Sequence, residues 1–134
     1  MSNGAKGAGR RPHAKALAAS FLEFDLDREI DLLRREDGGA NGQNARTLVK
    51  HDDLRVVLIA LQAGAGIPEH QAPGRISVQT LRGEIRMRAL GKTFTLPVGG
   101  LLTLDREVPH SVEALEESVF LLTLVQPSPA RQEG

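Results

Sequence analysis

The sequence predicts one domain of antiparallel β-structure, a sandwich or barrel, preceded by a short helix. Short runs rich in β-branched and apolar residues recur at regular spacing, turn residues separate these runs, and no helical pattern lies between them. The chain has 134 residues, which is long enough to bury a core without cross-links. It contains no cysteine, which excludes disulfides, thiolate metal sites and cysteine nucleophiles.

The first segment, residues 1–20, is predicted to be a mobile basic tail because it is rich in Gly and Ala and has no hydrophobic periodicity. It carries basic side chains at Lys6, Arg10, Arg11 and Lys15 and no acidic ones. A nucleic-acid-binding arm is one interpretation, but so few charges make few phosphate contacts, and a solvated tail is favoured. The segment also lacks the apolar block of a signal peptide.

Residues 21–45 are predicted to hold a short helix and a polar loop. Leu26, Ile30 and Leu33 are spaced i, i+4 and i+7, so they share one face of a helix. Asp25 or Asp27 can cap the start of this helix by accepting free backbone N–H groups. The helix is expected over residues 26–35, with its polar face carrying Glu29, Arg34, Arg35 and Glu36.

Residues 46–125 are predicted to form the barrel, and residues 126–134, which contain two prolines, a C-terminal tail. The run at residues 54–62 is apolar except at Arg55 and Gln62 and includes Val56, Val57 and Ile59, so we expect a strand buried on both faces. Glycines at positions 64 and 66 break it. The other expected strands are residues 46–50, 75–81, 84–89, 92–96, 100–104, 111–115 and 119–125.

Two segments of the predicted barrel resemble the two motifs of the cupin family. The first runs from His70 to Gly83 (HQAPGRISVQTLRG), and the second runs from Gly99 to His110 (GGLLTLDREVPH). Both spacings match the family pattern, and the resemblance covers about residues 54–124. It implies a jelly-roll barrel of the double-stranded β-helix type, often dimeric. Cupins range from enzymes to regulators and storage proteins, so the fold does not fix the function.

The resemblance also implies where a metal would bind, and here the sequence departs from the family. Metal-binding cupins usually present two histidines and a glutamate from the first motif and one histidine from the second. His70 and His110 occupy the first and last of these positions, but Ala72 and Ile76 occupy the other two. Iron, zinc, manganese or nickel could use the two histidines, although such metals usually have more protein ligands in enzymes.

Strand alternation predicts what surrounds these histidines. Side chains alternate between the two faces of a strand, so residues at even spacing from His70 share its face if it points into the barrel. Val112 and Ala114 likewise share the face of His110. We therefore expect an apolar pocket with two imidazoles as polar anchors. The residues expected on the wall with His70 are Ala72, Ile76, Val78 and Thr80.

Two functions are compatible with this pocket. The first is a non-catalytic or regulatory protein that binds a small organic ligand between His70 and His110. The alternative is a metal-dependent enzyme of the dioxygenase or isomerase type that uses the same histidines as ligands. A purely structural or interaction role through the outer sheet is a third possibility.

The composition of the chain predicts which classes of partner the protein binds and in which compartment it is located. The apolar runs at residues 54–62 and 120–125 exceed what one barrel interior needs, which predicts a homodimer. There are 17 basic and 17 acidic side chains, so no net charge favours nucleic acid or an anionic membrane. No apolar run approaches the roughly 18 residues that span a bilayer. We expect a cytoplasmic protein that binds neither nucleic acid nor membrane.

Overall fold

The computed structural model describes residues 20–36 and 39–127 of the chain. The chain divides into two compact units, residues 1–31 and residues 32–134. The predicted basic tail, apart from Ser20, lies outside the described residues, as does all but the start of the predicted C-terminal tail. No helix among the described residues is long and apolar enough to span a membrane.

Helix α2 (Leu26–Arg34) forms where the amphipathic pattern predicts it. Its start is capped by Asp25, whose Oδ1 accepts the backbone N–H groups of Asp27 at 3.1 Å and of Arg28 at 3.4 Å. Ile30 is buried, as predicted. The prediction that Glu29 lies on the polar face is wrong, because its side chain is only 8% exposed. Position 29 is i+3 from the first apolar residue of the stripe, so helical geometry places it on the apolar face.

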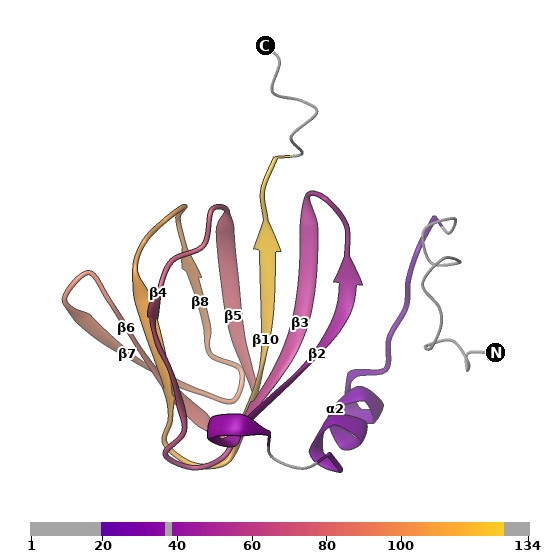
Figure 1. Cartoon of the computed structure of the whole chain (residues 1–134), viewed down its shortest axis with the longest axis horizontal. Coiled ribbons are helices and arrows are strands. Elements are labelled where there is room, and N and C mark those ends of the chain that lie inside the picture. The colour runs from indigo at the N-terminus through magenta and orange to yellow at the C-terminus, as the bar shows by residue number, and fades with distance from the viewer. Residues whose placement is uncertain (1–19, 37–38, 128–134) are drawn as a thin grey trace. The chain divides into compact units, whose positions relative to one another are not determined.

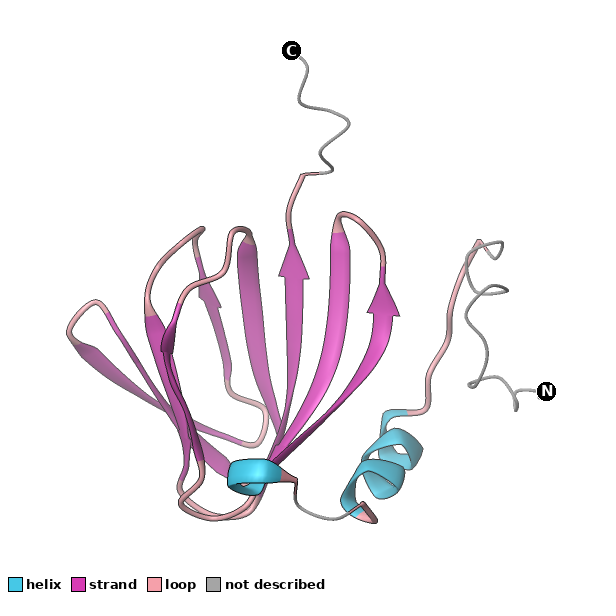
Figure 2. Ribbon diagram, in the orientation of Figure 1, coloured by secondary structure: helices cyan, strands magenta, loops and turns pink. Residues whose placement is uncertain are grey.

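The barrel consists of two antiparallel sheets built from residues 43–125, which confirms the predicted jelly-roll class (Figures 1 and 2). A short 3-10 helix, η2 (Ala40–Gly42), precedes the first of its strands. In spatial order, one sheet holds β2 (Gln43–Lys50), β3 (Leu54–Leu61), β10 (Ser118–Val125), β5 (Arg75–Arg82) and β8 (Leu101–Leu104). The other holds β4 (Gly66–His70), β9 (His110–Ala114), β6 (Glu84–Ala89) and β7 (Lys92–Pro97).

The strand that carries His70 was not predicted from the sequence. The glycines at positions 64 and 66 were expected to begin a loop, whereas β4 extends from Gly66 to His70. Its sequence, GIPEH, contains no alternation of apolar and polar residues, and Pro68 cannot donate a hydrogen bond. Because β4 is an edge strand, its proline is tolerated there. The other strands differ from their predicted ends by at most three residues.

The core of the barrel lies between the two sheets. Phe120 is 2% exposed and faces Ile59 on one neighbouring strand and Thr80 on the other. The same alternation continues along the sheet, so Ile76 and Val78 of β5 and Leu122 and Leu124 of β10 also point inward. The buried core cluster comprises Leu61, Ile76, Val78, Ile85, Met87, Ala89, Leu96, Leu104, Val112, Ala114 and Phe120.

A buried hydroxyl joins the two sheets at the start of β10. Ser118 is completely buried, and its Oγ accepts the backbone N–H of Glu84 at 3.0 Å. The same Oγ lies 3.1 Å from the carbonyl oxygen of Glu84 and 2.7 Å from that of Glu116, so its proton also has an acceptor. This hydroxyl therefore connects β10 of one sheet to β6 of the other.

We expect Ser118→Ala to lower the free energy of unfolding by about 1–3 kcal/mol, because it leaves the Glu84 N–H without that acceptor in a buried place. Urea unfolding followed by circular dichroism measures the change. Ser77→Ala is the matched control, since Ser77 is half-buried and makes no side-chain hydrogen bond within the described residues. Equal losses in the two variants would contradict the role given to Ser118.

Candidate functional site

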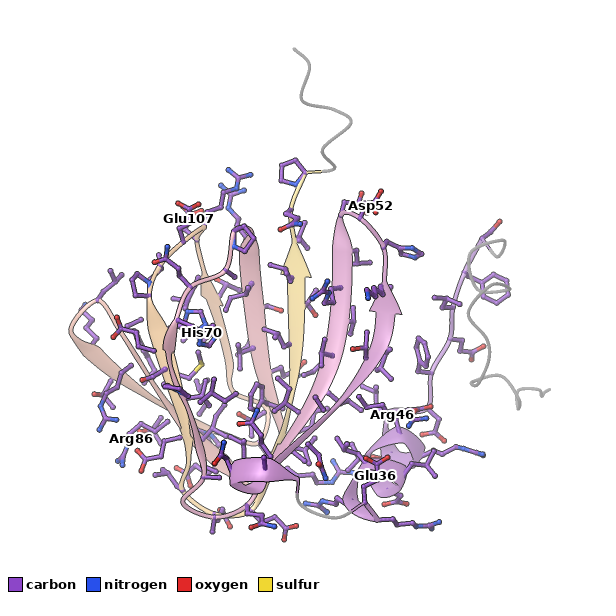
Figure 3. All side chains as sticks on the ribbon, viewed as in Figure 1. Glu36, Arg46, Asp52, His70, Arg86 and Glu107 are labelled. Atoms are coloured by element: carbon purple, nitrogen blue, oxygen red, sulfur yellow. The ribbon has the colours of Figure 1, made fainter. Side chains whose placement is uncertain are left out.

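The two histidines singled out by the sequence lie side by side in the structure. His70 ends β4, His110 begins β9, and the two residues are directly opposite each other in the antiparallel pair. Their ring centroids are 4.3 Å apart, and the ring planes are inclined by 59°. Figure 3 shows His70 on β4, on the same side of the barrel as the loop that carries Glu107. Residues distant in the chain thus form one imidazole pair.

A β-bulge in β4 determines which residue faces His110. Ile67 pairs with Val112, but the next matched pair is His70 with His110, so β4 uses one residue more than β9 over this interval. Regular pairing from Ile67 would place Glu69 opposite His110 instead. The bulge therefore aligns an imidazole, and not a carboxylate, with His110.

Backbone carbonyls fix the tautomer of both rings. The Nδ1 of His70 lies 3.0 Å from the carbonyl oxygen of Pro68, and the Nδ1 of His110 lies 2.9 Å from that of Val108. A carbonyl oxygen only accepts hydrogen bonds, so each Nδ1 carries the proton. In the neutral ring, Nε2 then carries a lone pair. Within the described parts of the chain, neither Nε2 has a hydrogen-bond partner.

The two histidines differ in their exposure to solvent. His110 is 5% exposed, whereas His70 is exposed at the edge of its sheet. Beyond the pair, the backbone N–H of Glu107 donates to the carbonyl oxygen of Ala72 at 2.8 Å. This bond connects the segment that follows His70 to the segment that precedes His110. A small molecule could therefore reach the imidazoles from the side of His70.

Comparison with known proteins identifies the fold. No known family model matches the sequence, and no curated protein matches it either. Among solved structures, a cupin superfamily protein from Desulfitobacterium hafniense is 16% identical, with 72% of this chain and 88% of that chain covered and a TM-score of 0.65. A cupin 2 conserved barrel domain protein from Leptotrichia buccalis is 28% identical, covering 69% of this chain and 45% of that one, with a TM-score of 0.63. The chain has the cupin fold.

One further structural neighbour of this barrel is an enzyme. Salicylate 1,2-dioxygenase from Pseudoaminobacter salicylatoxidans, in a mutant form, is 18% identical. The likeness covers 88% of this chain and 39% of that one, with a TM-score of 0.70. At this identity, the likeness concerns the fold alone.

The prediction that His70 shares one strand face with Ile76, Val78 and Thr80 is wrong, because the strand breaks after His70: His70 ends β4 of the four-stranded sheet, whereas the other three lie on β5 of the five-stranded sheet. Their side chains do point to the inside of the barrel, where they are closely packed. Ile76, Val78 and Thr80 are 6%, 2% and 0% exposed, so little of their surface can be reached. The Thr80 hydroxyl already donates to the carbonyl oxygen of Leu96 at 3.0 Å. Ala72 is half-buried against the same core cluster. A ligand-binding role for these wall residues stays a prediction.

The described residues do not complete the metal site of the cupin family. No group of three or more His, Cys, Asp or Glu side chains in this part of the chain could hold a metal ion. Glu113, on the strand of His110, points to the outer face, where its Oε1 lies 3.1 Å from Arg86 and 3.6 Å from Arg88. The four-ligand arrangement of metal-binding cupins therefore does not fit these residues.

A groove at the ends of β5, β8 and β10 was missed by the sequence analysis. Arg75, Asp105 and Arg106 line it, and Ile76 joins it to the core, but neither histidine contributes to it. Asp105 pairs with the Nε of Arg75 at 3.1 Å. The backbone N–H of Arg106 and the nearby Arg75 charge lower the pKa of Asp105 below its ordinary value. Adjacent charges in the turn of the second motif were the only sequence signal for this groove.

Proposed function

We propose that this cupin domain is a non-catalytic or regulatory module that binds a small organic molecule at His70 and His110. One observation carries the proposal: two neighbouring imidazoles hold their Nδ1 protons on backbone carbonyls, which leaves both Nε2 lone pairs available. Such a pair accepts hydrogen bonds and needs no acid–base step to hold a ligand. The ligand should therefore present two adjacent O–H or N–H donors.

The surroundings of the pair favour a ligand with an apolar body. Ala72 and Val108 flank the histidines, and both pack against the apolar core cluster. Small-molecule sites commonly combine apolar lining with a few polar groups that orient the ligand. Catechol has this chemistry, because two neighbouring hydroxyls project from one side of an apolar ring.

The test uses catechol as the probe and metal-free protein. We expect catechol to shift the imidazole resonances of His70 and His110 in NMR spectra, and its dimethyl ether, which has no donor, to shift neither. His70→Ala removes one acceptor and should weaken catechol binding about three- to tenfold, the effect of one hydrogen bond.

Gln71→Ala is the control, because Gln71 is exposed and directly follows His70. The proposal fails if catechol and its dimethyl ether bind alike, or if Gln71→Ala and His70→Ala have the same effect. Unchanged melting temperatures establish that both variants remain folded.

The alternative function is a metal-dependent dioxygenase or isomerase with His70 and His110 as ligands of iron, zinc, manganese or nickel. Water or a chelating substrate would have to supply every other ligand, because no third His, Cys, Asp or Glu joins the pair within the described residues. This requirement makes the binding module the better-supported function.

We also propose that the protein is a homodimer and that it is located in the cytoplasm. The cupin domain forms a homodimer through its outer face, where Leu101 and Val125 remain 59% and 50% exposed. The protein acts in the cytoplasm, as its composition predicts.

A further inference from the structure

We propose that the groove at the ends of β5, β8 and β10 binds a short extended peptide whose amino terminus and carboxylate are both free. Neither His70 nor His110 lines this groove, so the inference does not depend on the proposed function. The groove has a volume of about 1020 Å³, whereas small-molecule sites commonly measure about 300–1,000 Å³. It therefore has room for a short peptide.

One end of the groove offers donors for a carboxylate. Arg75 and Arg106 both line it. The Nε of Arg75 donates to the Oδ1 of Asp105 at 3.1 Å, and the backbone N–H of Arg106 donates to the same oxygen at 2.7 Å. The Nη groups of Arg75 and the guanidinium of Arg106 have no partner within the described residues. Asp105 offsets one of the two positive charges, so one remains for a ligand carboxylate.

The other end of the groove offers an acceptor for an ammonium group. Asp53 lines it, is exposed, and makes no ion pair in the part of the chain that the structure describes. The backbone carbonyl oxygen of Asp53 accepts the backbone N–H of Gln126 at 3.2 Å, which holds the turn between β2 and β3 against the end of β10. The Asp53 carboxylate is therefore available to a ligand cation.

The strand order sets the distance between these two ends. The ends of β3, β10, β5 and β8 follow one another across the sheet (Figure 1), and Leu54 pairs with Val125, which pairs with Arg75. Asp53 and Asp105 thus lie at strand ends separated by three spacings, about 14 Å between backbones. An extended tripeptide spans about 10 Å, and a hydrogen bond of about 3 Å at each end completes this distance.

A buried acceptor without a partner lies between the two ends. Gln126 lines the groove, and its Oε1 is buried and accepts no hydrogen bond within the described residues. Buried polar atoms are normally hydrogen-bonded, so this oxygen needs a donor, which a peptide N–H would supply. Ile76 and Leu104 add apolar surface to the groove. A cation acceptor, an N–H acceptor and a carboxylate donor in this order match a peptide with free termini.

The experiment titrates the full isotope-labelled chain with trialanine at low ionic strength and follows its NMR spectrum. We expect the Nε–H resonance of Arg106 and the backbone N–H of Gln126 to shift, and the Nε–H of Arg88 on the other sheet to remain unchanged. Val125 lines the groove and also lies on the face proposed for the homodimer, so the protein is titrated as it assembles in solution.

Two blocked peptides test the two ends separately. N-acetyl-trialanine has no ammonium group and trialanine amide has no carboxylate, so each should bind about three- to tenfold more weakly than trialanine. Arg106→Gln should weaken trialanine by the same factor and leave trialanine amide unchanged. Asp53→Asn should weaken trialanine and leave N-acetyl-trialanine unchanged. Gln126→Leu should weaken all three peptides alike.

Matched control variants change the same charges outside the groove. Arg88→Gln removes an exposed arginine on the four-stranded sheet, and Asp52→Asn neutralises the exposed neighbour of Asp53, which does not line the groove. Both controls should bind trialanine as the unchanged chain does, and unchanged melting temperatures establish that all variants are folded. The inference is overturned if trialanine does not bind, if either blocked peptide binds as tightly as trialanine, or if a control variant weakens binding as much as its counterpart in the groove.

Discussion

Replacing Gly83 by alanine should lower the free energy of unfolding by about 3–5 kcal/mol, because backbone strain and steric crowding add together at this position. Gly83 joins β5 to β6 with a φ of +76°, a region that side chains with a Cβ rarely adopt. A Cβ there would lie well inside contact distance of the Glu117 carbonyl oxygen and the Ser118 Oγ, and 2.8 Å from the Ser118 Cα. Backbone atoms cannot yield as a flexible side chain can. Urea unfolding followed by circular dichroism measures the loss.

Gly91→Ala separates the two causes. Gly91 has a nearly identical φ of +73°, but no atom lies within 4 Å of the position that its Cβ would take. This variant should therefore show the backbone penalty alone, about 1–2 kcal/mol. Equal losses for Gly83→Ala and Gly91→Ala would show that the crowding against β10 has no energetic effect.

Phe120→Ala should also destabilise the protein severely, by about 3–5 kcal/mol, the usual range for truncating a buried aromatic side chain. The side chain is 2% exposed and lies between Ile59 and Thr80 on the inner face of the five-stranded sheet. Its removal leaves a cavity in the core that the surrounding sheet can fill only in part. Small domains have about 5–15 kcal/mol of stability, so a substantial fraction of this variant should be unfolded at 37 °C.

Phe120→Leu is the control for this prediction. Leucine keeps most of the apolar volume, so its loss should be clearly smaller than that of alanine. Thermal and urea unfolding of the two variants should rank them in this order. A result in which alanine and leucine destabilise equally would mean that the ring itself, and not the filled volume, accounts for the contribution of Phe120.

Much of the barrel could be predicted because strand patterns are local. Neighbouring residues alone predict a strand at residues 54–62 and a turn at Gly83, and both are present in the structure. Strand alternation also predicts that Ile76, Val78 and Thr80 share one face, and all three are buried. Helix α2 was predicted for the same reason. The burial of Glu29 was not predicted, because this residue was assigned to the polar face by its charge and not by its position on the helix.

The candidate site was only partly predictable. The two motifs singled out His70 and His110, but strand β4 was missed because its five residues carry no periodic pattern. The groove beside Arg75 depends on strand ends that meet only in the folded chain.

By itself, the sequence determined the strands other than β4, their inward faces and the two imidazoles, because side-chain direction follows a period of two along each strand. Only the tertiary structure decided that His70, and not Glu69, faces His110, because one extra residue in β4 shifts its pairing with β9. Register between strands depends on contacts across the sheet. No pattern within either strand could have shown that the two rings would lie 4.3 Å apart.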